Sequence, residues 1–320
     1  MFLIQLENIL SNITFSLLFI TTCFYWGAIA ISPEITFEQS VVPNQLNIIP
    51  STNKAKGFFG NFGIFATITT ITLELVLRGW ISGHFPLSNL YESLLFLGWS
   101  LLLIYQYLEK SLNTTLLGAF IMPVILCIIA FTSFFLPSEL QASQPLVPAL
   151  QSNWLLMHVS VMILSYAGLL IGCILSILYL ILSFFSRVNP IKTLVVSSVE
   201  NTSPISNPSI LKIQKLLQIL DSVSYRTVGI GFCFLTLGIL SGAVWANETW
   251  GTYWSWDPKE TWAFITWLVF ATYLHARFIK GWEGKKPAVI ATCGFFVIWM
   301  CYLGVNLLGQ GLHSYGFFQS

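Results

Sequence analysis

Eight long apolar stretches dominate the alternation of hydrophobic and polar positions along the chain. They cover residues 11–32, 58–79, 90–109, 115–137, 154–186, 224–246, 260–279 and 287–308. A bilayer core of ~30 Å needs about 20 apolar residues in a helix, whereas barrel strands are shorter and alternate every second residue. The pattern therefore predicts an all-α integral membrane protein, with residues 1–320 forming a single polytopic domain of about eight transmembrane helices.

Composition supports this class. Hydrophobic residues make up 55% of the chain and charged residues only 8%, against about 25% charged in a typical soluble domain. This excludes a soluble enzyme, a disordered protein and a nucleic-acid binder that uses a basic surface. The six cysteines fall in apolar stretches without a C-x-x-C pair, so we expect packing residues rather than disulfides. Residues 1–10 lack a basic region, so we expect no cleavable targeting signal.

Basic residues fall mostly on one side of the expected membrane. With eight spans, one side receives connections 33–57, 110–114, 187–223 and 280–286 with the adjoining helix ends. That side holds 12 of the 14 basic residues: Lys54, Lys56, Lys110, Arg187, Lys192, Lys212, Lys215, Arg226, Arg277, Lys280, Lys285 and Lys286. Arg78 and Lys259 lie on the other side. The positive-inside rule then predicts that both termini lie outside the cytoplasm or its equivalent.

The longest connection, 187–223, lies on the basic side. Its centre, 197–209, is rich in Ser, Asn and Pro and indicates a flexible linker. Apolar residues at near-helical spacing in Ile210–Leu220 predict a short interfacial helix before the sixth span.

Tryptophans cluster in the connection on the opposite side. Residues 245–262 read W-A-N-E-T-W-G-T-Y-W-S-W-D-P-K-E-T-W and hold five of the 12 tryptophans. An interfacial aromatic belt is the alternative interpretation, but a belt spreads over many helix ends. Several flat apolar rings with a few charges suit a large, flat, amphipathic ligand. Haem, with an apolar ring and anionic propionates, is such a ligand.

The same segment resembles the tryptophan-rich WWD motif of haem-handling proteins in cytochrome c maturation. The pattern W-G-x-x-W-x-W-D-P-K-E is formed by Trp250, Gly251, Trp254, Trp256, Asp257, Pro258, Lys259 and Glu260. Segments 83–95 and 309–318 also look like the CcsA branch of this family. The resemblance implies haem-binding roles for Trp250, Trp254, Trp256 and Asp257.

The resemblance further implies a component of system II cytochrome c synthesis. Such a protein binds haem b as a substrate at a lumenal site and presents it for thioether attachment to apocytochromes c, such as cytochrome f and cytochrome c6 types, with a C-x-x-C-H motif. It works with a CcsB-type membrane partner, as a subunit of a haem lyase complex, and indirectly with thiol-reducing proteins of the lumen. The expected location is the plastid thylakoid membrane. A cyanobacterial thylakoid or a bacterial inner membrane is the alternative, because either would impose the same physical constraints on the chain.

Two histidines flank the tryptophan loop on its own side. His158 begins the fifth span and His313 follows the eighth. Two imidazoles can hold one haem iron from opposite faces; alternatively, each hydrogen-bonds a carbonyl at a helix end. The resemblance favours the pair as external haem ligands.

His275 is expected inside the membrane, because it follows Glu260 by 15 residues, or ~22 Å along a helix. A histidine at this depth is a functional candidate, with an interfacial position as the alternative. The resemblance implies a second haem ligand whose partner histidine comes from the CcsB-type protein.

Weaker candidates are His84 and Arg78. His84 could be a substitute ligand, part of an apocytochrome docking surface, or simply solvated. Arg78 and Lys259 are candidate partners of a haem propionate. The spacing of Arg78 and Glu74 also predicts an i, i+4 ion pair that eases their burial.

No acid, base or nucleophile is clearly required for this chemistry. Asp257 and Glu260 are weak catalytic candidates, because each could move a proton or cap the helix that starts at Pro258. Two other classes stay open: a haem exporter without a role in ligation, for which Pro123 in the fourth stretch is the only hint of a broken helix, and a structural membrane subunit that recruits partners.

Overall fold

The computed structural model describes residues 2–31, 37–42, 45–50, 54–112, 114, 116–142, 151–188 and 208–308. The long helices are α1 Phe2–Ile31, α2 Lys54–Ser82, α3 Leu90–Leu112, α4 Gly118–Ala130, α6 Asn153–Val188, α8 Pro208–Trp250, α9 Pro258–Phe278 and α10 Lys285–Trp299. The shorter elements are strands β1 Phe37–Val42 and β2 Gln45–Pro50, π-helical turns η1 Phe131–Phe135 and η3 Met300–Gly304, and helices α5 Ser138–Gln141 and α11 Val305–Leu308.

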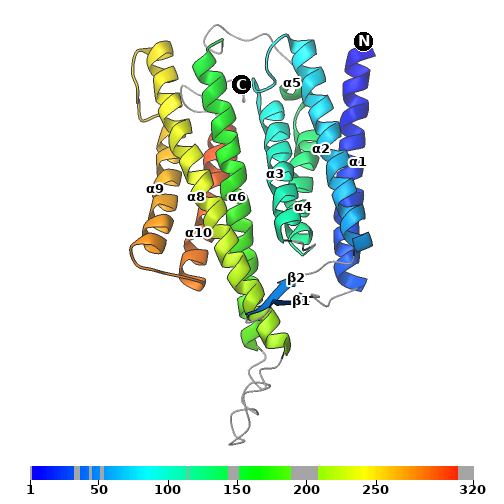
Figure 1. Cartoon of the computed structure of the whole chain (residues 1–320). Coiled ribbons are helices and arrows are strands. Elements are labelled where there is room, and N and C mark those ends of the chain that lie inside the picture. The colour runs from blue at the N-terminus through cyan, green and yellow to red at the C-terminus, as the bar shows by residue number, and fades with distance from the viewer. Residues whose placement is uncertain are drawn as a thin grey trace, which may run out of the picture.

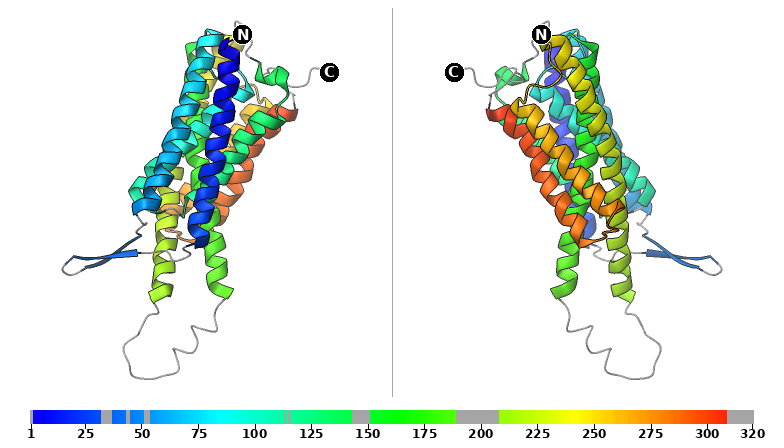
Figure 2. Two further views of the ribbon diagram at one scale, coloured as in Figure 1. Left: turned by 90° about the vertical axis from the view of Figure 1, so that its right-hand side faces the viewer. Right: turned by 90° about the vertical axis from the view of Figure 1, so that its left-hand side faces the viewer.

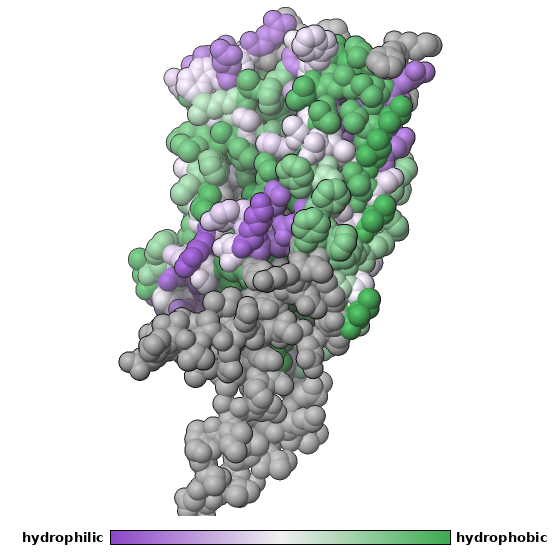
Figure 3. All heavy atoms as spheres, turned by 45° about the vertical axis from the view of Figure 1, so that its right-hand side comes forward, coloured by the Kyte–Doolittle hydropathy of each residue, from purple (hydrophilic) through white to green (hydrophobic). Residues whose placement is uncertain are grey.

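Each of the eight predicted apolar stretches is helical, which confirms the all-α membrane class. Within the described residues, six helices are long and apolar enough to cross a bilayer: α1, α2, α4 with η1, α6, α8, and α10 with η3. The other two, α3 and α9, carry charged residues at their ends and run beside the six in the same bundle (Figure 1). Apolar side chains cover much of the face shown in Figure 3, with hydrophilic side chains at its upper end and in a second group lower down.

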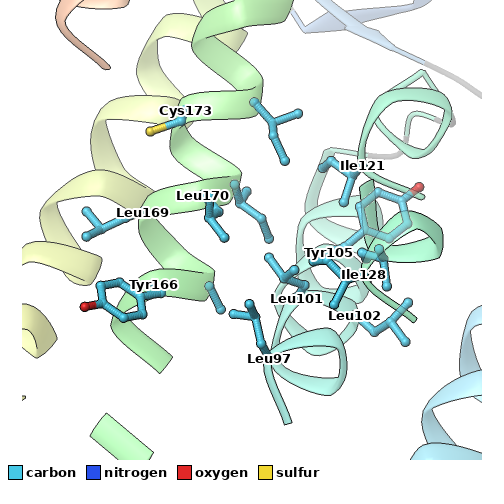
Figure 4. Packing of buried hydrophobic residues seen from close by; sticks show 14 of the residues in the cluster. Leu97, Leu101, Leu102, Tyr105, Ile121, Ile128, Tyr166, Leu169, Leu170 and Cys173 are labelled. Atoms are coloured by element: carbon cyan, nitrogen blue, oxygen red, sulfur yellow. The ribbon is translucent and has the colours of Figure 1, made fainter. Parts of the chain in front are cut away.

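α6 lies at the centre of the bundle (Figures 1 and 2). It contacts α3 and α4 on one side and α8 and α10 on the other. Figure 4 shows Leu170 of α6 facing Leu97 and Leu101 of α3, and all three side chains are buried. The cores of the two helix groups therefore meet on α6.

The two ends of the bundle differ. The N-terminus of α1, the α2–α3 loop, the start of α6 and the α8–α9 loop lie at the upper end in Figure 1, which we call the Trp-loop end. The opposite end holds the α9–α10 connection and an antiparallel β1–β2 hairpin that the hydropathy pattern did not predict. The side of the membrane that each end faces stays a prediction.

α6 and α8 project beyond the other helices at the lower end of Figure 1. They contain 36 and 43 residues, or about 54 and 65 Å of helix, and so exceed the ~30 Å bilayer core. Ile210–Leu220 forms the first turns of α8 rather than the expected separate interfacial helix. Leu216 and Leu220 are buried, so tertiary packing continues the helix through this segment. Of the predicted linker centre, 197–209, residues 197–207 lie outside the described residues, and residues 208 and 209 begin α8.

Small residues bring α6 and α8 into close contact. A Cβ on Gly168 would lie 3.3 Å from the Cα of Gly231, and a Cβ on Gly172 would lie 2.5 Å from Cγ2 of Val228. Two hydroxyls complete the seam: Ser165 donates to the Gly231 carbonyl at 2.9 Å, and Ser224 donates to the Gly172 carbonyl at 2.8 Å. Such small-residue contacts with interhelical hydrogen bonds are typical of helix association in lipid.

Arg78 ties four elements together at the Trp-loop end. Its guanidinium bonds Glu7 of α1 at 2.5 Å, Glu92 of α3 at 2.7 Å and the carbonyl of Gln141 in α5. The expected ion pair with Glu74 is therefore replaced; Glu74 instead accepts a hydrogen bond from Tyr91 at 2.9 Å. Helix spacing alone did not reveal that a carboxylate from a neighbouring helix lies closer to Arg78.

A glycine pair on α8 tests the α6–α8 seam. We expect Gly231→Ala to destabilise the protein by about 1–3 kcal/mol, because its Cβ would lie 2.9 Å from the backbone nitrogen of Leu169. Gly229→Ala is the matched control, since nothing lies within 4 Å of its added Cβ. Thermal unfolding in detergent measures both variants, and equal unfolding temperatures would contradict the seam.

Candidate functional site

A cavity of about 210 Å³ opens at the Trp-loop end between the α2–α3 loop, α3, α6, α8, the α8–α9 loop, α9, and η3 with α11. Apolar side chains make up most of its wall. Its described lining residues are Leu87, Ser88, Asn89, Leu90, Ser93, Leu155, His158, Val159, Met162, Ile163, Tyr166, Ile239, Gly242, Ala243, Trp245, Tyr253, Trp254, Lys259, Glu260, Ala263, Cys301, Tyr302 and Asn306.

His158 lines this cavity from the second turn of α6. Its Nδ1 lies 2.7 Å from the carbonyl oxygen of Gly238 on α8. Because a carbonyl only accepts, Nδ1 of the neutral ring carries the proton and Nε2 keeps the lone pair that a metal ligand needs. The ring also packs against Gly242, where an added Cβ would lie 2.5 Å from Cε1. The α6–α8 seam thus fixes both the position and the tautomer of His158.

The α8–α9 loop presents its aromatic rings in two directions. Gly251 ends α8 with a φ of +77°, and its N–H donates to the carbonyl of Asn247 at 2.9 Å. Trp256 has a φ of +58°, a conformation that is uncommon for a bulky residue. Its ring lies perpendicular to that of Trp254, at 86° with centroids 5.8 Å apart. The backbone turn therefore directs the two rings to different surroundings.

Only part of the tryptophan cluster reaches the cavity. Trp254, Trp245 and Tyr253 line it, whereas Trp256 is 68% exposed. Trp250 packs against Trp245 with centroids 4.8 Å apart, so it supports the wall from behind. Nε1 of Trp254 is buried and has no hydrogen-bond partner among the described residues. An unpaired buried donor in a cavity wall suits a ligand acceptor.

Lys259 and the end of α10 form the polar part of the cavity. Nζ of Lys259 donates to Oδ1 of Asn306 at 2.8 Å, and no described carboxylate forms an ion pair with it. Cys301 and Tyr302 lie in the π-helical turn η3, a local widening often found at functional sites. Sγ of Cys301 lies 3.3 Å from the hydroxyl of Tyr166. The cavity therefore offers a cation and neutral donors within a mostly apolar wall.

Asp257 and Glu260 form a capping box at the start of α9. Asp257 accepts from the backbone N–H of Lys259 at 3.2 Å, and Glu260 accepts from the backbone N–H groups of Asp257 at 3.2 Å and Ser255 at 2.8 Å. These contacts satisfy otherwise unpaired N–H groups. Of the two open roles for this pair, helix capping has direct structural support.

Three other predicted residues, His275, His84 and Arg78, are not among the described lining residues of the cavity. His275 is exposed near the opposite end of α9, and its neighbour Arg277 pairs with Asp221 at 2.8 Å. His84 lies in the α2–α3 loop with Nδ1 3.1 Å from the carbonyl of Phe85. Arg78 is buried in its ion pairs. His313 lies outside the described residues.

Several cavity residues were missed by the sequence analysis. Tyr166, Cys301, Tyr302 and Asn306 come from two helices far apart in sequence. Asn306 could have been recognised from the sequence as a candidate site residue, because a side-chain amide inside an apolar stretch needs a hydrogen-bond partner. The others read as ordinary helix residues, and only packing brings them together.

Residues 87–313 match the family model described as cytochrome C assembly protein. Relatives with the description cytochrome c biogenesis protein CcsA resemble the chain over nearly its whole length. The relative from Chlorella vulgaris is 54% identical and covers 98% of this chain and 97% of its own. The relative from Chlamydomonas reinhardtii is 45% identical with 98% of both chains covered, and that from Synechococcus elongatus is 46% identical with 99% of both covered.

The fold also resembles a solved structure, the cytochrome c haem lyase CcmF. The TM-score is 0.60 at 16% identity, and the match covers 92% of this chain but 46% of the longer one. At this identity the likeness shows the fold alone.

We expect Asp257→Ala to destabilise the protein by about 1 kcal/mol, because it removes the side-chain cap of α9. Asp257→Asn should retain most of the stability, since asparagine is an equally good cap. Thermal unfolding of the two variants in one detergent makes the comparison. If the alanine variant matched the parent, the capping role would be refuted.

Proposed function

Because the chain belongs to the CcsA family of cytochrome c biogenesis proteins, we propose that it binds haem b as a substrate in the cavity at the Trp-loop end and presents it for covalent attachment to apocytochromes c. The observation that carries this proposal is that His158, Trp254 and Lys259, from separate elements, line one cavity. An iron ligand, an aromatic surface and a cation match the three chemical parts of haem.

His158 ligates the haem iron through Nε2 in this proposal. Its hydrogen bond to Gly238 holds the ring, and such orienting bonds strengthen a metal-bound histidine. His313 supplies the opposite axial ligand, as the family resemblance implies. Two axial imidazoles protect the iron until the substrate's own histidine displaces one of them.

Trp254 contacts the apolar part of the haem ring, and Lys259 binds a propionate. None of the described carboxylates forms an ion pair with Lys259, and an ammonium group in a mostly apolar wall gains from an anionic ligand. Trp250 and Trp256 act less directly: Trp250 supports Trp245, and Trp256 offers an exposed ring beside Trp254. Arg78, already bonded to two carboxylates, is left out of the binding set.

The cavity is smaller than the ~300–1,000 Å³ typical of enclosed ligand sites. Haem would therefore be held along part of its surface, with an edge accessible from outside. An accessible edge is what attachment requires, because the vinyl groups must meet two substrate thiols. The contribution of this chain is then positioning, which can lower a barrier by several kcal/mol without an acid or base.

His275 serves a second haem site at the opposite end in this proposal. Its exposure on α9 leaves it accessible to a neighbouring protein, and a CcsB-type partner would supply the other ligand. Relatives in Chlorella vulgaris and Synechococcus elongatus support a thylakoid location, with the Trp-loop end in the lumen. A haem exporter without a role in ligation is the competing function.

Histidine variants test the ligand assignment. In the full-length protein purified with its CcsB-type partner, His158→Ala and His313→Ala should each shift the reduced haem spectrum or lower retained haem about tenfold. Added imidazole should restore the spectrum, because it replaces the missing ligand. His275→Ala should affect a separate haem population, and His84→Ala, outside the cavity, is the control.

The ligand assignment would be refuted if all four variants had the same haem spectrum as the parent protein, or if the parent protein contained no haem. Normal haem binding without attachment to any apocytochrome would instead favour the exporter.

The orientation of His158 has a test of its own. Gly242→Ala should alter the haem spectrum in the same sense as His158→Ala, because its Cβ would displace the ring. Gly229→Ala, on the same helix with open space around it, should leave the spectrum unchanged. Imidazole should again restore the Gly242→Ala spectrum. An unaltered Gly242→Ala spectrum would show that the close packing does not position the ligand.

A further inference from the structure

A second hollow lies beside the haem cavity. It holds about 170 Å³ and runs between the α2–α3 loop and the start of α6. Leu87, Ser88, Leu155 and Val159 line both this hollow and the haem cavity. The two spaces are therefore neighbours that share a wall.

We propose that this hollow, which we call the loop–α6 groove, is the docking site for the polypeptide substrate, namely the apocytochrome segment that carries the two acceptor thiols. The inference rests on the proposed function, because it assumes that haem occupies the adjoining cavity. It adds the place where the second substrate binds.

The lining chemistry suits a peptide. Ser88, Gln151, Ser152 and Asn153 bring hydroxyl and amide groups, and Phe85 and Leu156 bring apolar surface. No charged side chain is among the described lining residues, so neither an anionic headgroup nor a metal ion is favoured. Neutral donors and acceptors beside apolar surface match an extended main chain with small side chains.

Both rims of the groove are held in place. The backbone N–H and hydroxyl of Ser88 each donate to Glu92 at 2.7 Å, and Glu92 also bonds Arg78. On the other rim, Ser152 accepts from the N–H of Trp154 at 3.2 Å and so begins α6. Pre-formed rims lower the ordering cost of binding a flexible segment.

The chemistry of attachment requires this closeness. Each thiol adds across one vinyl double bond: the S–H bond breaks, sulfur bonds to the vinyl carbon next to the ring, and the proton goes to the terminal carbon. No external oxidant or reductant is consumed. The reacting atoms must approach within about 3–3.5 Å, so the peptide must lie against the haem edge. A segment in the loop–α6 groove lies directly beside the cavity, because Leu87, Ser88, Leu155 and Val159 line both spaces.

Photo-crosslinking tests the site directly. A photoreactive amino acid is placed at Asn153 in the groove or, as control, at Ile9, which is 53% exposed on α1. The probe is a synthetic C-x-x-C-H peptide with both cysteines replaced by serine, so that it binds without reacting. We expect crosslinking at 153 to exceed that at 9 by about tenfold, and to exceed that of a scrambled peptide similarly.

Equal crosslinking at both positions, or equal capture of the scrambled peptide, would overturn the proposal. A second measurement uses haem stain of denaturing gels. Asn153→Trp should lower haem attachment to an apocytochrome about tenfold while the haem spectrum of the protein stays normal, and Ile9→Trp should change neither.

The two proposals can fail separately. A normal haem spectrum with no crosslink at 153 refutes the groove and leaves the haem site intact. Absence of haem with a motif-specific crosslink refutes the haem site and supports peptide docking.

Discussion

The close contact between α6 and α8 is the constraint on which the site depends. In a membrane, apolar side chains gain little free energy when they leave lipid to contact another helix. Helices therefore associate through tight packing and interhelical hydrogen bonds. Gly168, Gly172 and Gly231 allow this approach. The same seam continues to Gly238 and Gly242, which receive Met162 and His158. The α6–α8 seam therefore both joins the two helix groups and holds the proposed iron ligand, His158.

Two polar clusters hold the loops around this seam. Arg78 fixes the α2–α3 loop through Glu92, and the Asp257–Glu260 capping box fixes the end of the tryptophan loop. Burying an arginine is costly unless its partners are present, and removing one partner of a buried pair typically costs 3–5 kcal/mol. Charged residues at this end thus have structural partners, and Lys259 stands out as the cation that faces the cavity.

The proposed division of labour follows from this geometry. The chain supplies a ligand, an aromatic wall and a cation on a rigid frame, while the reacting thiols and vinyl groups belong to its substrates. A cavity that encloses only part of a haem leaves room for a neighbouring peptide groove. Positioning two substrates side by side requires no nucleophile from the protein.

Hydropathy and capping signals are sufficient to predict the eight helices, the start of α9 at Pro258 and the shared end of the bundle for His158 and the tryptophan loop, because both are local properties of the chain. Tertiary structure decided that α8 continues through 210–220, that Arg78 pairs with Glu92, and that Trp254 lines the cavity while Trp256 does not. Each of these depends on which neighbour a side chain meets or on a backbone angle set by packing. Contacts between helices distant in sequence leave no periodic signal, so they could be found only in the folded chain.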